Sequence, residues 1–105
     1  MKLLRVSGKA LNSYRKSVKG NEFTTKDQAR RKLTRNVALA NEVLHKSEFQ
    51  RFIGTKVYTY GNLHITVRFG KVVEIVNHSG GHHYKSWKKD MKKYAKLTKE
   101  LNITD

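Results

Sequence analysis

Hydrophobic and polar positions alternate most clearly between Thr55 and Val76. β-branched and aromatic residues dominate this stretch, and glycine-centred turns divide it into runs of strand length. The pattern predicts a three-stranded antiparallel meander. A two-residue turn at Gly61-Asn62 places Tyr58 opposite Ile65 on the next strand. One face then collects apolar side chains for the core, namely those of Tyr58, Tyr60, Leu63, Ile65 and Val67.

The second turn decides which residues of the third strand join this core face. A three-residue loop at 69–71 pairs Val67 with Val73 and Ile65 with Ile75, whereas a two-residue loop would bring an acidic residue among the apolar ones. We therefore predict the longer loop. The opposite face is expected to be a mixed surface of Val57, Thr59, His64, Thr66, Arg68, Val72, Glu74 and Val76.

A helical period precedes the meander. Thr25 with Gln28 three residues later is a capping box, which predicts the start of an amphipathic helix. Its apolar stripe comprises Ala29, Leu33, Val37, Ala40 and Leu44. Ser47 with Gln50 is a second capping signal, for a short helix or a kinked continuation that ends at Gly54.

A second helix is predicted after the loop at 77–83. Apolar positions recur at alternating steps of three and four, and we expect this stripe to pack on the sheet. Its members are Tyr84, Trp87, Met91, Tyr94, Thr98 and Leu101. The other sides of this helix are nearly all lysine.

The first part of the chain is basic and has little sustained periodicity after Val6. We predict a possibly flexible arm at 1–23 and a single α+β domain at 24–105. Leu3, Leu4 and Val6 offer a short strand that would pin the arm to the core, and order on binding and stable local structure both stay open. The predicted fold class is α+β in the order α-β-β-β-α, with both helices on one face of the sheet.

Charge is the strongest global signal, because 23 Lys and Arg stand against 8 Asp and Glu and give a net charge of +15. Such a field attracts phosphate backbones and other polyanions. The chain has no cysteine, so thiolate metal sites and disulfides are excluded. Arg5 and Lys9 interrupt the first apolar run far short of a signal peptide or membrane span. We expect a soluble cytoplasmic protein without cofactor or membrane contact, whose oligomeric state stays open.

The favoured function is non-enzymatic binding of nucleic acid, either RNA or DNA, through the phosphate backbone. Lysines and arginines grip phosphates without reading bases, so no sequence specificity is implied. The alternative is a solvated charged face with no ligand. The predicted phosphate contacts are Arg15, Lys16, Lys19, Arg30, Arg31, Arg35, Lys85, Lys88, Lys89, Lys92 and Lys96.

The histidines suggest a different function, that of a metal-independent endoribonuclease. One histidine would take the proton of the 2′-hydroxyl, another would protonate the leaving oxygen, and a cation would stabilise the phosphorane. The candidate residues are His64, Arg68, His78 and His83. No metal site is expected, because the histidines lack carboxylate or cysteine partners nearby in the sequence.

The order helix, three strands, helix is similar to that of the double-stranded RNA-binding domain. Lys92-Lys93-Tyr94-Ala95-Lys96 also has the KKxAK spelling of that family's last helix. This is a resemblance of shape, and no function is carried over from it. A third function is a phage counter-defence inhibitor, similar in kind to anti-CRISPR proteins, that docks on a nucleoprotein enzyme by competing for its nucleic acid.

Overall fold

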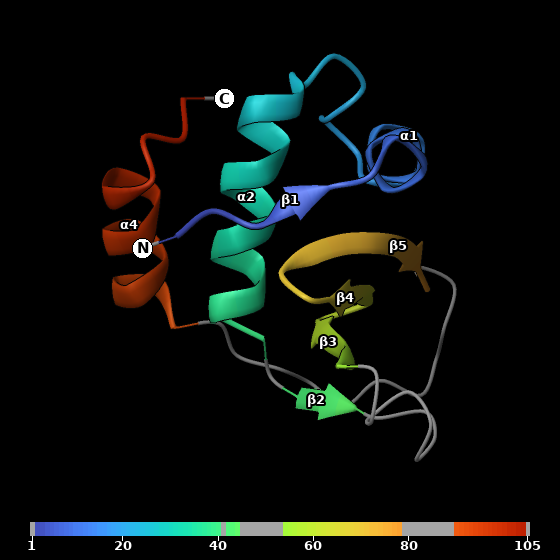
Figure 1. Cartoon of the computed structure of the whole chain (residues 1–105). Coiled ribbons are helices and arrows are strands. Elements are labelled where there is room, and N and C mark those ends of the chain that lie inside the picture. Colours follow the sequence, from blue (N-terminus) through green and yellow to red (C-terminus); the bar gives the residue numbers. More distant parts are fainter. Residues whose placement is uncertain (1, 41, 45–53, 79–89, 105) are drawn as a thin grey trace.

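The computed structural model describes residues 2–40, 42–44, 54–78 and 90–104 (Figure 1). Three helices and five strands lie in these ranges. In chain order they are β1 (Arg5–Val6), α1 (Gly8–Ser17), α2 (Lys26–Ala38), β2 (Glu42–Leu44), β3 (Thr55–Tyr60), β4 (Leu63–Arg68), β5 (Lys71–Asn77) and α4 (Met91–Glu100). The strands form one mixed sheet in the order β1-β5-β4-β3-β2. The α+β class is therefore confirmed, and the predicted meander is the centre of a larger sheet.

The register of the meander agrees with the sequence pattern over most of its length. Tyr58 pairs with Ile65, and Ile65 pairs with Ile75, as predicted. Leu63 and Ile65 are buried beneath the helices, where Tyr58 packs at the margin of the core. The apolar alternation was thus sufficient to identify the core face of β4.

The predicted three-residue loop between β4 and β5 was wrong. The register shifts between Thr66 and Val67, so that Val67 pairs with Val72, and only Phe69 and Gly70 form the turn. Val72 is fully buried in the core, where the sequence pattern had placed Val73. The irregularity in the ladder lets a two-residue turn coexist with an inward-facing Ile75, a combination that the simple pairing rules did not include.

The opposite face of the sheet is not the open mixed surface that was expected. Val57 is 2% exposed and Thr59 4% exposed, and Thr55 on the same face is also buried. His64 and Thr66 are half-buried, and only toward Arg68 and Val76 does this face become exposed. On β3 this face is more buried than the predicted core face, where Lys56 is exposed and Tyr58 and Tyr60 are half-buried.

The beginning of the chain is folded rather than an arm. β1 pairs in parallel with β5, which confirms the short strand that Val6 indicated. Ser7 caps α1 by accepting a hydrogen bond from the Ala10 amide at 3.1 Å. Ala10 and Tyr14 are buried between α1 and the sheet. The apolar signal was missed because α1 buries few side chains along its ten residues.

α2 begins where the capping box predicted, since the Thr25 hydroxyl accepts a hydrogen bond from the Gln28 amide at 3.1 Å. Ala29 and Leu33 are fully buried against the same core as α1. The helix ends at Ala38, and the predicted continuation of its stripe to Leu44 was wrong because that residue lies in β2. The short helix expected between Ser47 and Gly54 falls mainly outside the described residues.

α4 packs beside α2 instead of directly on the sheet (Figure 1). Leu97 and Leu101 form a second buried cluster with Leu39, at the C-terminal end of α2. Met91 was predicted to face inward but is 61% exposed. The predicted positions Tyr84 and Trp87 lie outside the described residues. α1 and α2 share one buried core cluster with the sheet, and Tyr60 of β3 packs against the cluster that Leu97 and Leu101 form with Leu39.

Within the described ranges, the structure contains no helix that is both long enough and apolar enough to cross a membrane.

Candidate nucleic-acid interface

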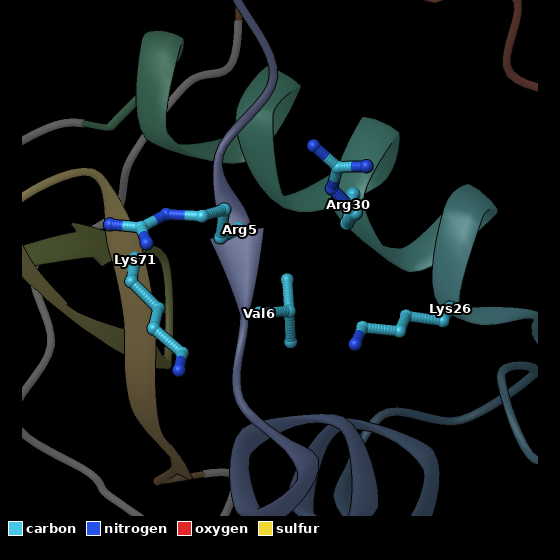
Figure 2. Close-up of a pocket in the computed structure, with 5 residues that line it drawn as sticks. All are labelled: Arg5, Val6, Lys26, Arg30 and Lys71. Carbon is cyan, nitrogen blue, oxygen red and sulfur yellow. The ribbon is translucent and has the colours of Figure 1, made fainter.

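A cavity of about 270 Å³ lies between β1 and α2. The described residues that line it are Arg5, Val6, Lys26, Arg30 and Lys71. Four of these five side chains are cationic and none is acidic. In Figure 2, Lys26 and Arg30 reach from α2 toward β1, whereas Arg5 and Lys71 come from the paired strands.

A second cavity of about 530 Å³ adjoins the first, because both are lined by Arg5 and Arg30. Its remaining described lining residues are Lys2, Leu3, Phe69 and Gly70. We call the two cavities together the basic cleft. The cleft thus combines five cationic residues from three segments of the chain with one aromatic residue.

The parallel pairing of β1 with β5 builds the strand side of the cleft. Arg5 lies directly opposite Lys71 in the ladder, and its Nη2 donates a hydrogen bond to the Phe69 carbonyl at 2.8 Å. The amides of Arg5 and Ser7 donate to β5 and the turn before it, so the intervening amide of Val6 points toward the open edge of the strand. Val6 is also one of the residues that line the cavity between β1 and α2.

Side chains of α2 hold the other wall in place. Arg30 Nε donates to the Leu4 carbonyl at 3.0 Å, and the Leu4 amide donates to Thr34 Oγ1 at 2.9 Å. These two bonds fasten the segment before β1 to the middle of α2. Lys26 is the first residue of the same helix. The width of the cleft is therefore set by backbone and side-chain bonds, not by the lysines themselves.

The charges of the cleft are not balanced by the acidic residue closest to it in the sequence. Asp27 follows Lys26, but its carboxylate is paired with Arg31 Nε at 2.9 Å. Like charges that converge on one cavity repel one another, and an anion placed between them relieves the repulsion. The arrangement is suited to an anionic ligand with several negative groups.

Two arginines that the sequence indicated as phosphate contacts instead join α2 to α4. The Arg35 guanidinium is buried, lies 4.2 Å from the centre of the Tyr94 ring, and donates to Thr98 Oγ1 at 3.1 Å. Arg31 Nη1 donates to the Leu101 carbonyl at 2.6 Å. These contacts use the guanidinium groups for packing and hydrogen bonding within the fold.

The other predicted phosphate contacts are spread over the molecule. Arg15 Nε donates to the Thr24 carbonyl at 2.9 Å, whereas Lys16 and Lys19 are exposed near the end of α1. Lys92 and Lys96 are exposed on α4. Lys85, Lys88 and Lys89 lie outside the described residues. Among the predicted contacts that the structure describes, Arg30 alone lines the basic cleft.

The histidine candidates are partly brought together. The rings of His64 and His78 have their centres 4.4 Å apart and are tilted by 58°. Arg68 lies four residues from His64 on the same strand, roughly 13 Å along it, and donates to Thr55 Oγ1 at 2.9 Å. His83 lies outside the described residues. In the part of the chain that the structure describes, no three His, Asp or Glu side chains gather as metal ligands would.

Sequence reasoning missed most of the cleft. Lys2 and Arg5 were assigned to a flexible arm, and Lys71 to a turn. Lys26 was noticeable as a cation in the first turn of a helix, where the helix dipole disfavours positive charge. Nothing in the local pattern indicated that β1 and β5 would be parallel neighbours. No sequence pattern therefore predicted that these residues would lie together.

Comparison with known proteins gives one family. The family model described as YorE matches residues 4–100, a span that includes every helix and strand described above. The SPbeta prophage-derived uncharacterized protein YorE of Bacillus subtilis (strain 168) is 42% identical over 107 residues, which cover 100% of this chain and 86% of that protein. No solved structure matches the chain.

Proposed function

The chain belongs to the YorE family, and we propose that this member binds nucleic acid without cleaving it, with the basic cleft as the site that holds the phosphates. The observation that supports the proposal is the convergence of Lys2, Arg5, Lys26, Arg30 and Lys71 on two adjoining cavities. Isolated surface lysines need no ligand. Cations that share a concave site with no acidic lining residue are typical of phosphate recognition.

Backbone groups add to this argument. Val6 lines the same cavity and its amide lies at the open edge of β1, and phosphate oxygens accept hydrogen bonds from both amides and guanidinium groups. A phage origin was part of the third function that the sequence suggested, and the relative's name describes that protein as prophage-derived. A small basic nucleic-acid binder fits such an origin.

The test is a comparison of two triple variants that remove equal charge. Lys2, Lys26 and Lys71 are changed to Gln in the cleft variant, and Lys92, Lys96 and Lys99 are changed to Gln in the α4 variant. Fluorescence anisotropy measures the affinity for labelled single-stranded and duplex oligonucleotides between about 50 and 300 mM salt. If three phosphate contacts to a single strand are lost, the slope of log affinity against log salt falls by about 2, which corresponds to a loss of about 40-fold at physiological salt.

We expect the cleft variant to show this loss and the α4 variant to lose less than about threefold through the general field. These lysines are chosen over Arg5 and Arg30 because the two arginines also hold the backbone. Equal losses in the two variants would mean that binding follows net charge and that the cleft is not the site. Absence of binding by the natural sequence would refute the proposed function itself.

The contact between His64 and His78 favours one second candidate, the metal-independent ribonuclease. Two imidazoles at this separation can act as general base and general acid toward one phosphodiester. Such an enzyme would cut RNA in the presence of a chelator and spare DNA, because it needs the 2′-hydroxyl. Loss of cleavage by about 10² or more in His64→Ala and His78→Ala would establish it. If the RNA stays intact after long incubation, the ribonuclease is refuted and binding is the remaining function.

A further inference from the structure

Phe69 is a large aromatic side chain that the fold leaves in solvent. It is 69% exposed, although it belongs to the tight turn between two strands of the sheet. Its backbone φ is 48°, in the left-handed region that bulky residues rarely adopt. The first position of such a turn is ordinarily filled by Gly, Asn or Asp. A phenylalanine here is disfavoured by both exposure and backbone conformation, so the stability of the turn does not account for it.

The ring of Phe69 is nevertheless held in place. It lies against the backbone of Gly54, where an added Cβ would come within 2.7 Å of the ring carbon Cε1. The Phe69 carbonyl accepts the hydrogen bond from Arg5 Nη2 at 2.8 Å. Gly54 therefore contacts the ring on one side, and Arg5 of the cleft holds the backbone of Phe69. The exposed remainder of the ring is an apolar surface on the turn that borders the cleft.

Phe69 lines the same cavity as Lys2, Arg5 and Arg30. An aromatic face next to a phosphate-binding groove is the combination that binds single-stranded nucleic acid, because the bases stack on the ring while the backbone follows the cations. We propose that the ligand of the basic cleft is a single strand, and that Phe69 stacks on one of its unpaired bases. This inference rests on the proposed function and names its substrate class.

A duplex is the less suitable ligand for this site. Its bases are already stacked on one another and paired, so an aromatic ring at the side of the phosphates has no base face to contact. Stacking does not depend on base identity, since every base has an aromatic face. Phe69 therefore adds affinity for single strands with little sequence preference.

The experiment measures dissociation constants by fluorescence anisotropy for single strands of about 12 nucleotides, made both as oligouridine RNA and as oligothymidine DNA, and for a duplex of the same length. The variants are Phe69→Ala, Phe69→Asn and Phe69→Tyr. Asn removes the ring but tolerates positive φ, so it separates loss of stacking from loss of folding. Phe23→Ala is the matched control, because that ring is 97% exposed and lines neither cavity of the cleft.

We expect Phe69→Ala and Phe69→Asn to weaken both single strands by about 10-fold, with an unchanged salt slope, and to change duplex affinity by less than about twofold. Phe69→Tyr should retain single-strand affinity, and Phe23→Ala should have no effect. An affinity of Phe69→Asn equal to that of the natural sequence would overturn the stacking role. The triple lysine variant of the cleft would in that case still lose affinity, so the failure would not be mistaken for failure of the proposed function.

Discussion

The basic cleft and the outer surface of α4 carry similar numbers of cationic side chains but present them differently. In the cleft, residues from β1, α2 and β5 converge on shared cavities, and none of the described lining residues is acidic. On α4, Lys92, Lys93, Lys96 and Lys99 spread over one exposed helix. Two of the α4 lysines have partners, since Lys93 Nζ donates to the Ala38 carbonyl at 3.2 Å and Lys96 lies 4.0 Å from Glu100.

Under our proposal, the density of positive charge in the sequence does not locate the binding site. In the sequence α4 is the more basic element. Its lysines are spread over a single helix, however, and water can solvate each of them separately. The cleft uses fewer charges per segment, but their fields add at one place because the walls bring them together. Three predictions test this contrast, beginning with the largest effect.

Arg35→Ala should lower the free energy of unfolding by about 2–3 kcal/mol, because it removes a buried cation–π contact and a charged hydrogen bond that join α2 to α4. The measurement is urea denaturation followed by circular dichroism. Lys96→Ala is the control and should leave stability essentially unchanged, as expected for an exposed lysine. An Arg35→Ala protein of unchanged stability but impaired nucleic-acid binding would show that Arg35 contacts the ligand. The difference between the cleft and the region of α4 would then be smaller than we propose.

Gly54→Ala should cost about 1–2 kcal/mol in stability and should also displace the Phe69 ring. Gly54 has a φ of +72°, which alanine rarely adopts, and the added Cβ would lie 2.7 Å from the Phe69 ring. Both the backbone at this position and the ring must therefore move. Urea denaturation and single-strand affinity are measured together. Gly20→Ala is the matched control. Gly20 also has a positive φ, of +88°, but an added Cβ there would meet no other atom within 4 Å. Equal affinity in the two variants would show that the position of the ring is immaterial.

Lys71→Glu should change stability and binding in opposite directions. The new carboxylate lies across the ladder from Arg5, so it should raise the free energy of unfolding by about 0.5 kcal/mol. The same change removes a phosphate contact that we propose for the cleft, and it should weaken single-strand affinity by about fivefold. Lys96→Glu on α4 supplies the comparison. A destabilised Lys71→Glu protein would show that the cations of the cleft serve the fold instead of a ligand.

Local patterns predicted the central part of the fold correctly. The capping box at Thr25 and the turn at Gly61-Asn62 depend on contacts between residues close in the chain, which the sequence displays directly. The same reasoning failed at the end of β4, where a shift in register placed Val72 in the core. It also failed for α1, whose few buried positions do not produce a clear apolar period.

The position of the candidate site could not be predicted from the sequence. A net charge of +15 indicated an anionic ligand without placing its site. It did not distinguish Arg30, which lines the cleft, from Arg35, which is buried against Tyr94 a little more than one helical turn away. Both are arginines on one helix, and the element that packs on each side of that helix decides their roles.

The sequence by itself therefore determined the strands of the meander, the start of α2 and the strongly positive net charge, because these follow from short-range periodicity, capping and composition. The tertiary structure decided which cations meet. Arg5 and Lys71 are far apart in the chain and become neighbours only through the parallel pairing of β1 with β5. Phe69 joins them because Gly54 and Arg5 hold its turn at that edge. Such pairing is set by packing over the whole core, and no local pattern records it.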